Sequence, residues 1–143
     1  MIKFLTKIKL AIAFQASLNY DAKHQYQKII NTLEKYRPFV DGELSNPFSE
    51  YFILLGEAYY KITNYRIAEG YFLNALEHID NEAKFNEDEK NYLKYITYYW
   101  LCLVYKDLYE DIKVKQCLNL LKKITFDENN IKRYIKNNFP LNN

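Results

Sequence analysis

The feature that most constrains the fold is the helical periodicity of residues 51–80, YFILLGEAYYKITNYRIAEGYFLNALEHID. Large apolar residues recur there every three or four positions, in two runs that are separated by a polar break at Thr63-Asn64. This spacing places the apolar residues on one face of each of two helices. Two such helices must bury their faces against each other and against further helices, so we expect an all-α chain.

Composition and length favour the same fold class. Three glycines and three prolines in 143 residues are too few for a fold of many strands and turns, and a hydrophobic content of 49% excludes a disordered chain. The length fits a single domain, residues 1–143. Periodicity and capping residues predict about seven helices. We expect them as helix pairs at about 3–36, 48–79 and 87–124, followed by a C-terminal capping helix at about 128–137.

The N-terminal residues MIKFLTKIKLAIAFQA are expected to form an amphipathic helix, at about 3–18, rather than a secretory leader. Lysines interrupt the apolar run, and the uninterrupted part, 10–14, is shorter than the roughly 7–15 residues of a signal core. Leu5, Ile8 and Ile12 lie on one face of this helix. Since no segment approaches the ~18–20 apolar residues that span a bilayer, we expect a soluble cytoplasmic protein without a membrane partner.

Local capping residues predict the other boundaries. Asp21 is expected to cap the second helix, and Asn46-Pro47 to begin the third as N-cap and first helical residue. Between them, residues 37–47 are rich in helix breakers and are expected to form a loop. The carboxylates of residues 87–89 are expected to begin a long helix, because they are stabilised at the positive end of its dipole.

Side chains suited to catalysis or metal binding are sparse. His24 and His78 have no neighbours at metal-ligand spacing, and Cys102 and Cys117 lack a CxxC spacing, so buried thiols are expected. The chain has no phosphate-binding loop, nucleophile elbow or calcium loop. A net charge of only +2 argues against nucleic-acid binding. We therefore expect no enzyme, no cofactor, no metal site and no nucleic-acid partner.

Residues 51–80 resemble the tetratricopeptide repeat, a repeated pair of antiparallel helices. The matching residues are Phe52, Leu55, Gly56, Tyr59, Ala68, Phe72 and Ala75. Small side chains at Gly56 and Ala68 let the two helices approach closely, while Tyr59 and Phe72 fill the space on either side.

Two further units match less well. The looser one contains Tyr98, Leu101, Cys102, Tyr105, Val114, Leu118 and Leu121, and the weaker N-terminal one contains Leu10, Ala11, Phe14, Ala22, Tyr26 and Ile29. The resemblance implies a short tetratricopeptide-like α-solenoid. The units recur every ~45 residues rather than the family's ~34, so we expect a compact helical layer instead of a regular superhelix. The last helix, with Ile131, Tyr134 and Ile135, is expected to cover the end of the stack.

The resemblance also implies that the first helix of each pair lines a concave, protein-binding surface. The matching positions are Glu50, Ile53, Glu57, Tyr60, Lys61, Ile96, Tyr99, Leu103, Lys106 and Asp107. Fifteen tyrosines and nine phenylalanines either fill the core or line a groove. On the long helix, Tyr92, Tyr95 and Tyr99 form a second stripe beside an apolar stripe of Leu93, Ile96, Trp100 and Val104.

Residues 77–89 carry six carboxylates against Lys84, a local charge of −5. These acids either cap a helix and solvate a linker, or form a rim that attracts a basic protein. The candidate partner-binding residues are Glu50, Glu57, Tyr60, Lys61, Tyr95, Tyr99, Lys106, Glu87, Asp88 and Glu89.

These observations predict a non-enzymatic protein-binding module. The excess of lysine over arginine, with abundant Asn, Ile, Tyr and Phe, is typical of an A/T-rich bacterial gene. For a small bacterial binder, the leading hypothesis is an immunity protein that neutralises one cognate toxin with a basic surface, such as a nuclease, by masking it. The alternative is a tetratricopeptide-type chaperone or adaptor for secreted or assembling proteins. The sequence leaves the oligomeric state open.

Overall fold

The computed structural model of the protein describes residues 2–44 and 47–132. Within these ranges the chain forms helices and turns and no strand, which confirms the predicted all-α class for this part of the chain. The helices are α1 (Ile2–Ala22), α2 (Tyr26–Leu33), α3 (Arg37–Gly42), α4 (Ser49–Lys61), α5 (Tyr65–Ile79), α6 (Glu87–Asp107) and α7 (Asp111–Lys123), with a 3₁₀ turn, η1 (Glu34–Tyr36), between α2 and α3.

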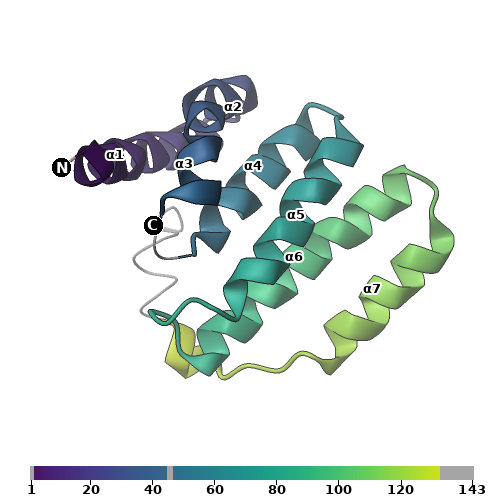
Figure 1. Cartoon of the computed structure of the whole chain (residues 1–143). Helices are drawn as coiled ribbons and strands as arrows, with labels where there is room; N and C mark the ends of the chain where they lie inside the picture. The colour runs from purple at the N-terminus through teal and green to yellow at the C-terminus, as the bar shows by residue number, and fades with distance from the viewer. Residues whose placement is uncertain (1, 45–46, 133–143) are drawn as a thin grey trace.

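Helices α1, α2, α4, α5, α6 and α7 pack in chain order across the molecule, each against the next in this series (Figure 1). One apolar core lies between α1, α2, α3, α4 and one side of α5, and a second lies between the other side of α5, α6 and α7. Helix α5 belongs to both cores because Tyr71 and Ala75 face the first, whereas Ala68 and Phe72 face the second. The fold is therefore a row of helices held together mainly by neighbours in sequence.

Three helix pairs, α1/α2, α4/α5 and α6/α7, close with the same turn. Each turn contains one non-glycine residue in the left-handed conformation: His24 (φ 57°), Thr63 (φ 66°) and Tyr109 (φ 59°). The N–H of the following residue donates to a tyrosine carbonyl five residues earlier: Gln25 to Tyr20 at 2.8 Å, Asn64 to Tyr59 at 2.9 Å and Glu110 to Tyr105 at 2.9 Å. This pattern is the Schellman motif, which satisfies carbonyls at the end of a helix.

A small, buried residue precedes each of these tyrosines by three positions: Ser17, Gly56 and Cys102. At Gly56 the packing of α4 and α5 leaves no room for a side chain, since a Cβ atom there would lie 2.6 Å from Cε1 of Phe72. The Ser17 hydroxyl donates to the Ala13 carbonyl at 2.8 Å, so its burial leaves no unpaired donor. The predicted close contact at Gly56 is confirmed.

The predicted N-terminal repeat unit is wrong in register. Helix α1 continues to Ala22, so Asp21 and Ala22 belong to its last turn, and Gln25 rather than Asp21 precedes α2. When the turns of the α1/α2 and α4/α5 pairs are aligned, Ser17 takes the position of Gly56. Ala11, the residue predicted for that position, is exposed. Backbone hydrogen bonds, and not a cap from the Asp21 side chain, stabilise this turn. The helix boundary predicted from capping residues is therefore misplaced.

The apolar face of α1 that carries Leu5, Ile8 and Ile12 does not pack inward. Leu5, Ile8 and Ile12 are 50%, 41% and 66% exposed, and α1 instead buries its opposite face. That face is made by Leu10, Ala13, Phe14, Ser17 and Leu18. Helix α1 thus has two apolar faces, and the one with small residues allows α2 to approach closely.

The segment 37–47 is not the expected loop, because residues Arg37–Gly42 form α3. A proline in the first turn of a helix is tolerated, since no partner is needed there for its missing N–H. Helix α4 begins at Ser49 after Phe48, so Pro47 is not its first residue. Asn46, the expected N-cap, lies outside the described residues.

The C-terminal helices follow the prediction more closely. Helix α6 begins at Glu87 as expected, but on α7 Leu118 is 44% exposed and Cys117 takes its place in the core. Residues 128–132 are helical and Ile131 is buried, in agreement with the expected capping helix. Tyr134 and Ile135 of that helix lie outside the described residues.

Candidate protein-interaction surface

Aromatic side chains from α4, α6 and the segment after α7 gather on one part of the molecule. We call this group, made of Tyr60, Tyr95, Tyr99, Trp100 and Phe126, the aromatic surface. Tyr95 and Tyr99 are four residues apart and therefore share a face of α6. They are 39% and 51% exposed, because α6 buries a different face, including Leu101 and Val104, against α5 and α7.

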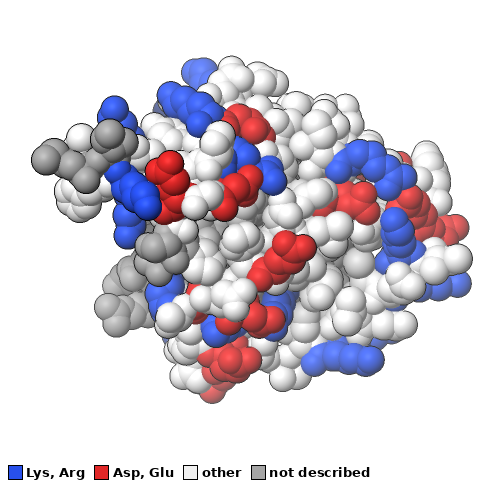
Figure 2. All heavy atoms as spheres, in the orientation of Figure 1, with Lys and Arg blue, Asp and Glu red and all other residues white. Residues whose placement is uncertain are grey.

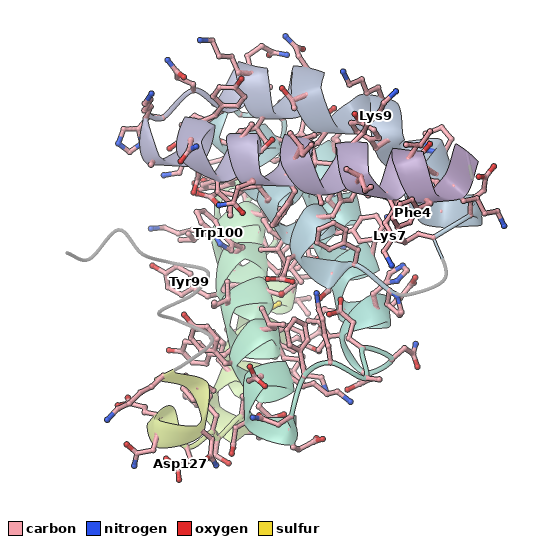
Figure 3. All side chains as sticks on the ribbon, turned by 90° about the vertical axis from the view of Figure 1, so that its left-hand side faces the viewer. Phe4, Lys7, Lys9, Tyr99, Trp100 and Asp127 are labelled. Atoms are coloured by element: carbon pink, nitrogen blue, oxygen red, sulfur yellow. The ribbon has the colours of Figure 1, made fainter. Side chains whose placement is uncertain are left out.

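Trp100 connects the aromatic surface to the core. One face of its ring stacks on buried Phe72, with centroids 6.1 Å apart and an interplanar angle of 5°. Tyr60 and Tyr99 meet the same indole at 5.5 Å and 6.3 Å in edge-on geometry. The Lys61 ammonium lies 5.7 Å from the Trp100 ring centroid, within the range of a cation–π contact. Figure 3 shows Trp100 and Tyr99 on the same side of the molecule.

Tyr60 fixes the ends of α4 and α6 to each other. Its hydroxyl donates to Oδ2 of Asp107 at 2.6 Å, across 47 residues of sequence. Burial, and then this hydrogen bond, raises the pKa of Tyr60, so the phenol stays neutral and donates. The exposed tyrosines therefore lie beside side chains that are held in place by contacts within the chain.

Phe126 extends the aromatic surface toward the other end of α6. Its ring meets Tyr92 at 5.4 Å and Tyr95 at 5.9 Å, both in edge-on geometry. Tyr92 is half-buried, whereas Tyr95 is exposed. In the predicted tyrosine stripe of α6, Tyr92 is thus partly packed against the rest of the protein, whereas Tyr95 and Tyr99 are exposed to solvent.

The structure brings four of the predicted binding residues together, namely Tyr60, Lys61, Tyr95 and Tyr99. Lys106 is exposed on α6, seven residues or two helical turns after Tyr99. Sequence reasoning missed Trp100, because its spacing fits the buried stripe. It also missed Phe126, which follows α7 in a non-helical segment and belongs to no periodic pattern.

Glu50 lies apart from the aromatic surface. It is in the first turn of α4, ten residues or roughly 15 Å along the helix from Tyr60. Its carboxylate accepts from Lys84 Nζ at 3.2 Å. It borders a groove of about 620 Å³, whose other lining residues include Lys7, Leu10, Phe14, Phe48 and Glu82.

Two of the three acidic residues at the start of α6, Asp88 and Glu89, have partners within the chain. Glu89 and Asn86 form a capping box, in which the Asn86 N–H donates to Glu89 Oε1 at 3.0 Å. Asp88 accepts from Asn130 Nδ2 at 2.7 Å, and this hydrogen bond contributes most to lowering the pKa of Asp88. Glu87 is exposed. The predicted helix start is confirmed, and Figure 2 shows acidic and basic side chains interspersed over the face that it displays.

Glu57 is half-buried in α4, and burial followed by the charge of Asp21 raises its pKa to about 8. Because the folded state favours the protonated carboxyl, this group stabilises the fold fully below pH 4.5, its ordinary pKa, and loses that contribution as the pH rises from there to about 8. We expect the free energy of unfolding to fall by about 2–3 kcal/mol more in the wild type than in Glu57→Gln between pH 6 and pH 9.

Urea unfolding of both proteins across that pH range measures this difference. Tyr26 and Lys61 also interact electrostatically with Glu57 and are retained in the variant. Parallel pH profiles for wild type and Glu57→Gln would show that Glu57 is ionised in the folded protein at neutral pH.

The two histidines have structural neighbours. His24 Nδ1 lies 2.9 Å from the Tyr26 hydroxyl, and the His78 ring stacks on Phe52 at 4.9 Å. Within residues 2–44 and 47–132, no group of three or more His, Cys, Asp or Glu side chains is placed to hold a metal ion.

Cys102 and Cys117 are free thiols buried between α6 and α7, as predicted. Burial raises the pKa of both, that of Cys117 to about 12. A thiol that holds its proton so firmly is a poor nucleophile at neutral pH.

Comparison with protein-family models gives no match, and searches of curated proteins and of solved structures give no significant match. None of the described helices is both long enough and apolar enough to cross a bilayer. The function is therefore inferred from the surface of this chain itself.

Proposed function

We propose that this chain is a protein-binding module that acts by occupying its partner, and that the aromatic surface is its contact site. The observation that carries the proposal is the exposure of Tyr95 and Tyr99 beside Trp100, whose indole stacks on the buried Phe72. Tyrosine and tryptophan offer a large contact area with few rotatable bonds, and they are enriched among residues that dominate binding energy. Their fixed placement reduces the entropy lost on association.

We further propose that the three helix pairs are tetratricopeptide-like units stacked as a short α-solenoid. The shared Schellman turns and the small residues Ser17, Gly56 and Cys102 support this proposal. In such a stack, α4 and α6 are first helices and line the concave surface. Tyr60 and Tyr99 then belong to that surface.

The specific role that we favour is inhibition of one partner, as by an immunity protein that masks a bacterial toxin with a basic surface. Proteins that bind many different partners often use flexible, methionine-rich or loop-rich surfaces that can repack. This chain has one methionine in 143 residues, and Tyr60 and Trp100 are held by several contacts. A rigid surface of this kind suits a single partner better than the alternative, a chaperone or adaptor.

The test compares three tagged proteins in cells that naturally express the chain. They are the wild type, the double variant Tyr95→Ala/Tyr99→Ala, and the control Tyr109→Ala, which removes an 89% exposed tyrosine from the α6–α7 turn. We expect the wild type and the control to retain one equimolar protein after a high-salt wash. The double variant should bind the isolated partner at least roughly 30-fold more weakly in calorimetric titration, the effect of losing a hot spot.

Each other outcome has a definite meaning. Several substoichiometric proteins bound by the wild type would support the chaperone alternative. Equal retention by all three proteins would exclude the aromatic surface as the contact site. Absence of any retained protein would argue against action by occupancy. Circular dichroism of the variants checks that the helices are intact.

A further inference from the structure

The outward face of α1 is apolar, and no helix within residues 2–44 and 47–132 covers it. Four large side chains lie on it, Phe4, Leu5, Ile8 and Ile12, with exposed fractions of 65%, 50%, 41% and 66%. Their spacing places them on one face of the helix, opposite the residues that pack inward. We call these four residues the α1 stripe.

The N-terminal half of α1 reaches beyond the helix it pairs with. Helix α1 has 21 residues and is roughly 31 Å long, whereas α2 has eight and is roughly 12 Å long. Figure 1 shows the start of α1 at the edge of the molecule. The α1 stripe therefore lies on a helix at the edge of the molecule.

The charges around the α1 stripe are all positive on this helix. Lys3, Lys7 and Lys9 are exposed, and the first acidic residue of the chain is Asp21. Figure 3 shows Lys9 on one side of α1 and Lys7, with Phe4, on the other. An apolar stripe between ammonium groups matches an anionic surface that also offers an apolar interior.

We propose that α1 binds an anionic lipid surface, lying in the plane of the headgroups with the α1 stripe inserted among the upper acyl chains. Amphipathic helices with lysines beside large apolar residues bind in this way. The lysine stems can extend along the apolar boundary while their ammonium groups contact lipid phosphates or carboxylates. This departs from the sequence expectation of no membrane partner, which did not foresee that the α1 stripe is left exposed.

A second copy of the chain fits the same face less well. Two α1 helices packed through their stripes would bring two sets of lysines together, and like charges placed opposite each other cost binding energy. Residues 2–20 of α1 contain no carboxylate that could compensate them. An anionic membrane supplies the missing negative charge and an apolar layer together.

The proposed membrane contact adds to the protein-binding function without using the same residues. In Figure 3 the labelled residues of α1 lie apart from Tyr99 and Trp100 on α6. Four apolar side chains and three lysines give reversible binding, because a short amphipathic stripe requires electrostatic help to remain bound. We expect the interaction to require anionic lipid and to weaken with salt.

The experiment measures binding of the full chain to two kinds of vesicle, one of phosphatidylcholine alone and one containing about 30% phosphatidylserine. Co-sedimentation should show binding to the second kind and little to the first, and the binding should be lost at about 0.5 M salt. As an independent readout, Phe4→Trp in a Trp100→Phe background should give a blue-shifted emission with the anionic vesicles only.

Variants separate the two parts of the contact. Ile8→Ser/Ile12→Ser should abolish binding, and Lys7→Gln/Lys9→Gln should weaken it roughly 30-fold, at about fivefold for each lysine. The matched control is Ile112→Ser, which changes an isoleucine on α7 that is 75% exposed and distant in sequence. It should bind like the wild type.

Several results would overturn the proposal. They are no binding of the wild type to anionic vesicles, equal binding to both kinds of vesicle, or wild-type binding by Ile8→Ser/Ile12→Ser. A dimer in solution that these two serines dissociate would instead assign the α1 stripe to a contact between copies. Loss of the protein partner in this variant, without vesicle binding by the wild type, would assign it to the protein site.

Discussion

Alanine at Gly56 is expected to destabilise the protein by about 2 kcal/mol, whereas alanine at Gly70 is expected to stabilise it by roughly 0.5–1 kcal/mol. Both glycines lie inside helices, so both substitutions gain the higher helix propensity of alanine. They differ in space, because a Cβ atom at Gly56 would lie 2.6 Å from the Phe72 ring, while nothing lies within 4 Å of one at Gly70.

The Phe72 ring has little freedom to move away. It is fully buried and stacks on Trp100 at an interplanar angle of 5°. The added methyl group must therefore push α4 and α5 apart or displace the ring, and overpacking of a filled core typically costs about 1–3 kcal/mol. The cost exceeds the propensity gain at Gly56, and only the gain remains at Gly70.

Urea unfolding of the two single variants measures these effects. A double variant, Gly56→Ala/Phe72→Leu, tests the cause, because a smaller flexible side chain should accept the methyl group. Its loss of stability should be less than the sum of the two single losses. Additive losses, or equal effects of alanine at Gly56 and Gly70, would contradict the contact between Gly56 and Phe72.

Alanine at Glu82 is expected to lower the free energy of unfolding by about 2 kcal/mol, unlike alanine at other acids of the same segment. Glu82 is only 2% exposed, and its Oε1 accepts from the Ser49 N–H at 2.5 Å. Ser49 begins α4, and the preceding residue, Phe48, provides no side-chain cap. The Glu82 carboxylate therefore caps α4 from 33 residues away and interacts favourably with the helix dipole.

Two matched variants separate the capping hydrogen bond from the charge. Glu82→Gln keeps an oxygen that can accept from Ser49, and burial already raises the pKa of Glu82 and so favours a neutral group. We expect this variant to stay within about 1 kcal/mol of the wild type. Glu77→Ala removes an exposed carboxylate and should change stability by less than about 0.5 kcal/mol. If thermal and urea unfolding give Glu82→Ala the same free energy of unfolding as Glu77→Ala, the capping role of Glu82 is excluded.

Local sequence signals predicted much of the C-terminal two thirds of the fold. The helix ends expected at about 79 and 87 agree with the end of α5 and the start of α6. In both helices the apolar period, the polar break before the helix and the acids at the start of α6 act within a few residues of each other. Such short-range effects depend only on neighbouring residues and can therefore be predicted from the sequence.

The N-terminal pair was placed less accurately because its local signals conflict. Helix α1 has apolar residues on two faces, so periodicity cannot choose between the α1 stripe and the face that contains Leu10 and Ala13. The small, buried Ser17 allows α2 to approach the face that contains Leu10 and Ala13, so this face packs inward. The left-handed conformation of His24 ends α1 after Ala22. Those conditions exist only once α1, α2 and α4 are packed.

For the candidate binding surface as well, some features follow from local sequence and others from the packing of the helices. Local patterns are enough to predict an all-α fold, a close contact between α4 and α5 at Gly56, and the shared face of Tyr95 and Tyr99 on α6. Packing of the helices is needed before Tyr60 binds Asp107, Trp100 borders the aromatic surface, and Glu82 is buried at the start of α4. These contacts join residues from different helices, and their energies depend on which faces are removed from water, a property of the packed molecule and not of any short stretch of it.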